Sequence, residues 1–224
     1  MTVAEKIMAF NDSLQPPKGL PSDVVVMNPY NDKLARSLAQ TFYQKYYNDF
    51  APRTILFGIN PGRFGGGITG VPFTDPIKLE EDCEIPNPFE KRPELSSRFI
   101  YEVIHAFGGP ATFYQKYFIS ALSPLGFTRG GINLNYYDIK NWRAIFENYA
   151  VDRIRDQQGF PVRKEVAYCI GQGQNLKFLE AINEKHRFFN RILTVPHPRW
   201  VMQYRLKRKK EFIQQYIETL RDQR

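Results

Sequence analysis

The sequence has few of the side chains that bind transition metals. Its 224 residues include only two cysteines, Cys83 and Cys169, and three histidines. Two thiolates cannot make a four-cysteine iron–sulfur site. No group of histidines and cysteines has the spacing of a zinc site, which also leaves no basis for a zinc-dependent base deaminase. We therefore expect a protein without a metal ion or any other cofactor.

Long hydrophobic runs are also missing from the chain. No apolar run approaches the ~20 residues that span a bilayer. Residues 1–6 lack the charged and then apolar pattern of a secretion signal. We expect no membrane partner, and a monomer located in the cytoplasm.

Acidic residues are outnumbered by basic ones, so that the formal net charge is +8 and the isoelectric point is near 9.4. Part of the excess is concentrated after Arg199, where Arg205, Lys207 and Arg208 precede the first acidic residue, Glu211. A basic cluster of this kind favours a polyanionic partner such as nucleic acid. The alternative is a solvated helix face in a generally basic protein.

The order of the expected elements indicates the fold class. Short apolar runs predict strands at 54–58, 116–123, 165–170 and 191–195. Helical patterns lie at 3–14, 33–48 and 140–155, after a Ser96 or Ser97 cap, after 173 through 181, and over 203–220, and the proline-rich stretch 75–93 reads as irregular. This alternation predicts a single-domain α/β/α sandwich over residues 1–224, with a central, mainly parallel four-stranded sheet.

A glycine-rich segment follows the first of these strands. Asn60, Pro61 and Gly62 force the chain to turn, and further glycines lead to Phe73. Glycines allow a close approach of the backbone and leave amides free to donate, while Phe73 offers an aromatic face. The segment is typical of a pocket for a planar ligand with polar edges, such as a nucleobase. The alternative is an ordinary turn, because glycine-rich loops are frequent false positives.

The acid–base candidate is His197, which follows the strand expected at 191–195. Histidine can donate a hydrogen bond to a developing oxyanion in either protonation state. His105 lies in a helical pattern and His186 in a charged stretch, so we expect both to be packing or surface residues. The sites expected at 60 and 197 both lie at the carboxyl ends of strands, where open α/β sheets bind ligands.

These two segments resemble the motifs of a known enzyme family. Residues 58–65 and 69–73 resemble motif 1 of the uracil-DNA glycosylase superfamily, and are most similar to its single-strand-selective monofunctional branch, in which Gly-Met-Asn-Pro-Gly-Pro-Phe-Gly precedes Thr-Gly-Val-Pro-Phe. Residues 197–199, His-Pro-Arg, resemble motif 2 in a contracted form that lacks an inner Ser-Pro. The resemblance implies a monofunctional hydrolase that removes uracil from single- or double-stranded DNA in base excision repair.

The resemblance also implies roles for individual residues. Uracil, flipped out of the strand, would stack on Phe73, while Asn60 positions the attacking water and His197 stabilises charge on the leaving base. Base-binding residues would be Ile59, Gly62, Phe64 and Phe73. DNA-binding residues would be Arg199, Trp200, Arg205, Lys207 and Arg208, although Trp200 fits a core position equally well.

The chain departs from the family pattern at Ala121. Relatives carry Asn-Leu-Cys-Pro there, and that asparagine reads the edge of uracil, which an alanine side chain cannot do. Either Asn133 or Asn135 replaces it, or specificity relaxes toward hypoxanthine or xanthine. Asp75 is a second open point, since it either approaches the water or belongs to a surface turn.

Two other classes of function remain. One is a DNA-binding module without catalysis, and the other is a small-molecule enzyme whose glycine-rich loop binds the phosphate of a free nucleotide. Gly171-Gln172-Gly173 reads as a tight strand-to-helix turn, because it lacks the third glycine of a dinucleotide fingerprint.

Overall fold

The centre of the protein is a four-stranded sheet with the strand order β3-β2-β6-β7. The computed structural model describes residues 1–221. The strands are β2 (Thr54–Gly58), β3 (Tyr117–Ala121), β6 (Val166–Ile170) and β7 (Arg191–Val195), and all three pairings are parallel. Every residue of β2, β3 and β6 is buried, as expected for a parallel sheet covered on both faces. The predicted fold class is confirmed.

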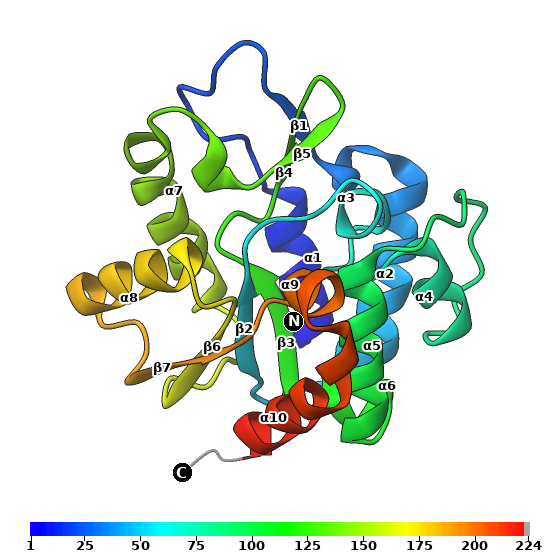
Figure 1. The fold of residues 1–224 in the computed structure, drawn as a ribbon. Helices are drawn as coiled ribbons and strands as arrows, with labels where there is room; N and C mark the ends of the chain where they lie inside the picture. The colour runs from blue at the N-terminus through cyan, green and yellow to red at the C-terminus, as the bar shows by residue number, and fades with distance from the viewer. Residues whose placement is uncertain (222–224) are drawn as a thin grey trace.

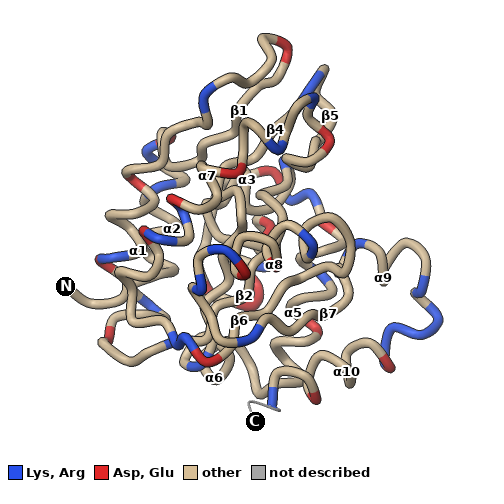
Figure 2. The backbone as a smooth tube through the Cα atoms, turned by 90° about the vertical axis from the view of Figure 1, so that its left-hand side faces the viewer, with Lys and Arg blue, Asp and Glu red and all other residues tan. Residues whose placement is uncertain are grey.

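Helices cover the sheet on its two sides (Figure 1). The longer ones are α1 (Val3–Asp12), α2 (Lys33–Tyr47), α5 (Leu95–Phe107), α7 (Trp142–Gln157), α8 (Gln174–His186) and α10 (Lys209–Arg221). The shorter ones are α3 (Gly66–Thr69), α4 (Pro76–Glu81), α6 (Pro110–Tyr114), α9 (Pro198–Tyr204) and the 3-10 turns η1 (Pro29–Asn31), η2 (Tyr136–Asp138) and η3 (Leu206–Arg208). Figure 2 shows α1 and α2 on one side of β2 and β6, with α9 and α10 on the other.

A second sheet was not expected from the sequence. It is antiparallel, with the order β1-β4-β5, and consists of β1 (Val25–Met27), β4 (Gly126–Arg129) and β5 (Ile132–Leu134). Its strands have only three or four residues and are partly exposed, so they carry no long apolar pattern. Gly130 and Gly131 form the two-residue hairpin between β4 and β5 and both have positive φ, 55° and 75°, which is the geometry of a type I′ turn.

Several helix boundaries differ from the sequence-based expectation. The helix expected over 203–220 is divided into α9, η3 and α10, because the backbone leaves the helical region at Arg205 (φ −134°), a residue type that gives no breaking signal. Ser96 and Ser97 do not cap α5, which begins at Leu95 after Glu94; the Ser97 hydroxyl accepts from the Asp75 N–H instead. The stretch expected to be irregular contains α4, and α8 continues five residues beyond Ala181 to His186.

Candidate active site

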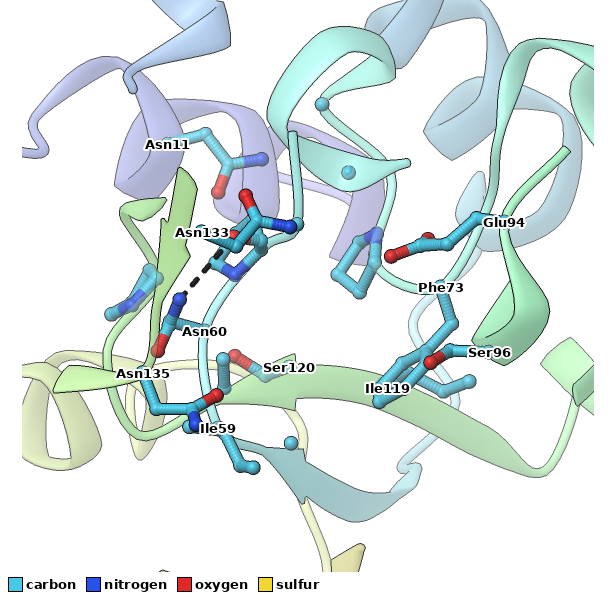
Figure 3. Close-up of a pocket in the computed structure, with 18 of the residues that line it drawn as sticks. Asn11, Ile59, Asn60, Phe73, Glu94, Ser96, Ile119, Ser120, Asn133 and Asn135 are labelled. Atoms are coloured by element: carbon cyan, nitrogen blue, oxygen red, sulfur yellow. Dashed lines mark hydrogen bonds between the residues drawn. The ribbon is translucent and has the colours of Figure 1, made fainter. Parts of the chain in front are cut away.

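A pocket opens where β2 and β3 end. It has about 970 Å³ of space, its open mouth included. Asn60 and Gly62 reach it from the turn after β2, Asn133 and Asn135 from β5 and the residue after it, and His197 from the start of α9. In Figure 3, Phe73 and Glu94 lie on one side of the pocket and the asparagines on the other. The pocket therefore lies at the carboxyl ends of the parallel strands, where open α/β sheets bind ligands.

The Asn60 carboxamide is held in a fixed orientation by the backbone around β5. Its Nδ2 donates to the carbonyl of Leu134 (3.1 Å), and its Oδ1 accepts from the N–H of Tyr136 (2.9 Å). These two hydrogen bonds identify which atom of the carboxamide is oxygen and which is nitrogen, because the two have nearly the same shape. A carbonyl oxygen has two lone pairs, so Oδ1 retains one for a water molecule.

Phe73 reaches the pocket through an unusual backbone conformation. Its φ is 53°, a region that an aromatic residue seldom occupies, and such strain is concentrated at functional sites. The ring passes over Gly58, where an added Cβ would lie 2.9 Å from the ring carbon Cε2. Its centroid is 6.3 Å from that of His197. Glycine at 58 thus makes room for an aromatic surface beside the imidazole.

His197 caps α9 with its own side chain. Nδ1 accepts from the N–H of Arg199 (3.2 Å), so it carries no proton, and the neutral ring must carry its proton on Nε2. Burial, followed by the charge of Arg199, lowers the pKa of His197 to about 4. At neutral pH the ring is therefore a neutral hydrogen-bond donor through Nε2.

Glu94 is a pocket residue that sequence reasoning missed. Its carboxyl lies against the glycine backbone, so that a Cβ at Gly62 or Gly65 would fall within 2.5 Å of a carboxyl oxygen. Burial and the negative charge of Asp75 raise the pKa of Glu94 to about 7, against the lowering effect of Arg199. No sequence motif marks Glu94, because it directly follows the proline-rich stretch 75–93 and only the folded chain brings it to the pocket.

Asp75 neither lines the pocket nor lies in a surface turn. It is 1% exposed, and one carboxylate oxygen accepts from the N–H of Lys78 while the other accepts from the N–H of Glu94. The residue therefore caps α4 and anchors the backbone of Glu94 at the pocket edge.

Of the other predicted base-binding residues, all but Phe64 line the pocket. Ile59, Gly62, Asn133 and Asn135 line the pocket. Asn133 Oδ1 accepts from the N–H of Arg63 (3.1 Å), and Asn135 Nδ2 donates to Asp138 (2.9 Å). Phe64 does not line the pocket.

The Phe64 ring is instead near two guanidinium groups. Their carbons are 4.4 Å (Arg63) and 5.5 Å (Arg92) from its centroid, which is a cation–π arrangement. The remaining histidines are also outside the pocket: His105 Nε2 contacts the carboxylate of Asp82, and His186 stacks on Phe188.

A groove continues from the pocket along α9. It shares Ile59, Asn135, His197 and Arg199 with the pocket and is further lined by Gln172, Gln174, Trp200 and Tyr204. Trp200 is 40% exposed and packs edge-on against Phe212, with the guanidinium of Arg205 4.9 Å from its ring. Tyr204, which no sequence motif marks, is 66% exposed.

The basic residues lie at the far end of this groove. Figure 2 shows them as a lysine and arginine segment at the outer edge of the molecule, between α9 and α10. Arg205 and Lys207 are exposed, and Arg208 forms an ion pair with Glu211 (2.8 Å). Exposed aromatic rings beside cationic side chains are typical of surfaces that bind single-stranded nucleic acid.

No group of three or more histidine, cysteine, aspartate or glutamate side chains within 1–221 could hold a metal ion. None of the described helices is long and apolar enough to cross a membrane.

Comparisons with known proteins identify the family and the fold of the chain. The family model "Uracil DNA glycosylase superfamily" matches residues 44–221. No curated protein matches the chain. Among solved structures, that of wild-type SMUG2 from Pedobacter heparinus is similar, with 40% sequence identity, a TM-score of 0.95, and coverage of 99% of this chain and 97% of that one.

Proposed function

The chain belongs to the uracil-DNA glycosylase superfamily, in the branch of the single-strand-selective monofunctional enzymes, and from that premise we propose that it hydrolyses the N-glycosidic bond of uracil in DNA. The observation that carries the proposal is the convergence of Asn60, Phe73 and His197 on one pocket. A DNA glycosylase needs a place for an extrahelical base, a positioned water and a donor for the leaving base. Each of these three side chains supplies one of them.

In the proposed mechanism the flipped uracil lies against Phe73. Flipping costs a few kcal/mol, and least for mismatched or single-stranded bases, which makes weakly paired uracil the preferred substrate. Asn60 Oδ1 holds a water molecule at the face of C1′ through its remaining lone pair. An amide is too weak a base to remove the proton early, so its contribution is positioning, and the C1′–N1 bond breaks before the new C1′–O bond is complete.

His197 stabilises the negative charge that leaves with the base. The electron pair of the C1′–N1 bond passes to uracil, where charge collects on O2, and the Nε2–H of the neutral imidazole donates to that oxygen. In this proposal the N–H of Gly62, which lines the pocket, adds to this stabilisation. After attack on C1′ the water loses one proton, which neutralises the uracil anion directly or through solvent, and keeps the other in the new C1′ hydroxyl. Water is the nucleophile throughout, so no covalent intermediate with the protein is formed.

The DNA strand follows the groove along α9 in this proposal. Arg199 and Trp200 fill the gap left in the base stack, and the exposed Arg205 and Lys207 contact phosphates. Arg208 contributes less because Glu211 already pairs with it. The protein acts as a monomer, since one chain supplies both the pocket and the groove.

The test is single-turnover cleavage of oligonucleotides that carry one uracil, hypoxanthine or xanthine, either single-stranded or paired. Wild type is compared with Asn60→Ala and His197→Ala. We expect alkali-labile sites at uracil, with the rate lowered at least 100-fold in both variants, which is the usual effect of removing a positioned catalytic group.

Other outcomes identify the alternatives. Cleavage at hypoxanthine or xanthine but not at uracil would mean a shifted specificity, in line with Ala121 at the position of the family's asparagine. Salt-sensitive DNA binding with no cleavage of any base would leave a non-catalytic DNA-binding module.

A further inference from the structure

A buried asparagine lies at the start of α8, close to the end of β2. Asn175 follows the turn at 171–173, where Gly171 has a φ of 115°, a backbone region that favours glycine. The turn brings the first residues of α8 to the carboxyl end of β6, which pairs with β2. Asn175 is 2% exposed and does not line the pocket that contains Asn60.

The Asn175 carboxamide links two segments of the chain. Its Nδ2 donates to the carbonyl of Gly58, the last residue of β2 (3.3 Å), and to Sγ of Cys169 (3.3 Å). Its Oδ1 accepts from the hydroxyl of Tyr136, the first residue of η2 (3.0 Å). Because the Gly58 carbonyl can only accept, these bonds also identify the nitrogen of the amide. One buried side chain therefore joins the end of β2 to η2.

Asn60 bridges the same two segments. It lies two residues after Gly58, and its Oδ1 accepts from the N–H of Tyr136 (2.9 Å). The hydrogen bonds from Asn60 to Tyr136, from Tyr136 to Asn175 and from Asn175 to Gly58 form a closed ring with the backbone from 58 to 60. Loss of the Asn175 bonds opens this ring and frees the distance between η2 and the end of β2, which is the distance that the Asn60 side chain spans.

The packing of the Tyr136 ring does not replace this link. The ring contacts Trp142 and Phe146 of α7 and Phe178 of α8, with centroids 5.6, 5.3 and 5.6 Å away, so it is packed against helices. Apolar packing is non-directional, whereas a hydrogen bond sets both a distance and an angle. Asn175 therefore supplies a directional connection between Tyr136 and β2.

The sheet keeps its own hydrogen bonds when the Asn175 amide is removed. The Gly58 carbonyl also accepts from the N–H of Leu122 (3.1 Å), and the Cys169 thiol donates to the carbonyl of Gly171 (3.4 Å). The Tyr136 hydroxyl is the group that loses its partner. A variant without the amide is therefore expected to fold, with η2 less firmly fixed.

We propose that Asn175 is a positioning residue, which keeps Asn60 Oδ1 turned toward the attacking water by holding Tyr136 at a fixed distance from the end of β2. The inference rests on the proposed function, because it concerns the support of the residue that holds this water. Asn175 touches neither the base nor the water and acts through Tyr136. A misplacement of about 1 Å can lower a rate 100-fold, so a catalytic side chain depends on the groups that fix it.

The test is single-turnover cleavage of an oligonucleotide with one uracil by wild type, Asn175→Leu and Tyr136→Phe, with both substitutions also made in an Asn60→Ala background. Leucine removes all the hydrogen bonds of the amide, and Asn175→Ala replaces it if leucine impairs folding. Phenylalanine removes only the hydroxyl and keeps the N–H that holds Asn60.

We expect the rate at saturating enzyme to fall at least tenfold in both variants, with unchanged affinity for the oligonucleotide. In the Asn60→Ala background neither substitution should lower the residual rate further, because the side chain that they position is already absent.

The control is Tyr47→Phe. Tyr47 is also buried, and its hydroxyl donates to the carbonyl of Tyr117 at the start of β3 (2.9 Å), outside the pocket. Its loss should lower the melting temperature about as much as Tyr136→Phe does and leave the cleavage rate unchanged.

Three results would overturn the inference while the glycosylase proposal stands. Equal slowing by Asn175→Leu in wild type and in Asn60→Ala would mean that Asn175 does not act through Asn60. An affinity that falls in step with the rate would assign Asn175 to DNA binding. A rate that is unchanged, or that falls no more than in Tyr47→Phe, would leave the amide a role in stability alone. If wild type does not cleave uracil, the inference and the proposed function fail together.

Discussion

The carboxyl of Glu94 should make the stability of this protein depend on pH near neutrality. Burial and Asp75 raise its pKa from 4.5 to about 7. The unfolded chain loses this proton near pH 4.5, whereas the folded protein keeps it until about pH 7, so between these values the folded state binds more protons and stability falls as pH rises. A rise of about 2.5 units at ~1.36 kcal/mol each amounts to about 3 kcal/mol.

Urea unfolding of wild type and Glu94→Gln at pH 5, 6, 7 and 8 measures this effect. The glutamine variant should gain on wild type as the pH rises, by up to about 3 kcal/mol between the extremes. The titration of His197 is common to both proteins and cancels in the difference. Glu211→Gln is the control, because Arg208 lowers the pKa of that exposed carboxyl, so its removal should not reproduce the trend. A stability difference that stays constant from pH 5 to 8 would refute the reasoning.

Three further predictions concern the pocket and the groove. Burial lowers the pKa of His197 to about 4, so the cleavage rate of Glu94→Gln, in which the other titrating pocket group is removed, should not change from pH 8 down to 5. An inflection near pH 6.5 in its single-turnover rates would contradict this. Gly58→Ala should lower the cleavage rate about tenfold or more with little loss of melting temperature, because the added Cβ displaces the Phe73 ring. An unchanged rate would mean that the Phe73 ring has no role in cleavage. Replacing Arg205 and Lys207 with glutamine should reduce the slope of log affinity against log salt by about 1 to 2 in fluorescence anisotropy, whereas an unchanged slope would place both outside the DNA interface.

The sequence was most informative where short apolar runs end at glycine or proline. β2 and β7 have the bounds that were predicted, because Gly58 is followed by Asn-Pro-Gly and Val195 by Pro196. The parallel pairing of β2 with β3 and β6, and of β7 with β6, follows from the helices that connect the strands. The turn after β2 and the histidine after β7 could be assigned to one edge of the sheet for the same reason.

Contacts between distant parts of the chain could not be predicted. The partners of Asn60 are 74 and 76 residues away, one at the end of a hairpin too short to be recognised from its pattern and the other in the 3-10 turn that follows it. Glu94 appears in the sequence as an ordinary charged residue, and only the fold brings it to the pocket. The interruption at Arg205 also has no local signal, since the helical pattern continues through it.

The Asn60 carboxamide is hydrogen-bonded to Leu134 and Tyr136, one residue on each side of Asn135, and we call these two bonds the clamp. The clamp ties the β4–β5 hairpin to the turn after β2, so that the two move together. Lengthening the hairpin at its exposed tip, Gly130–Gly131, adds chain beyond the clamp and leaves the carboxamide where it is. Inserting a residue between Leu134 and Tyr136 instead pulls the two anchors apart and turns the amide away from the pocket. The tip is therefore the position at which an affinity tag or an additional DNA-binding segment can be grafted onto this protein, within a few residues of Asn133 in the pocket lining.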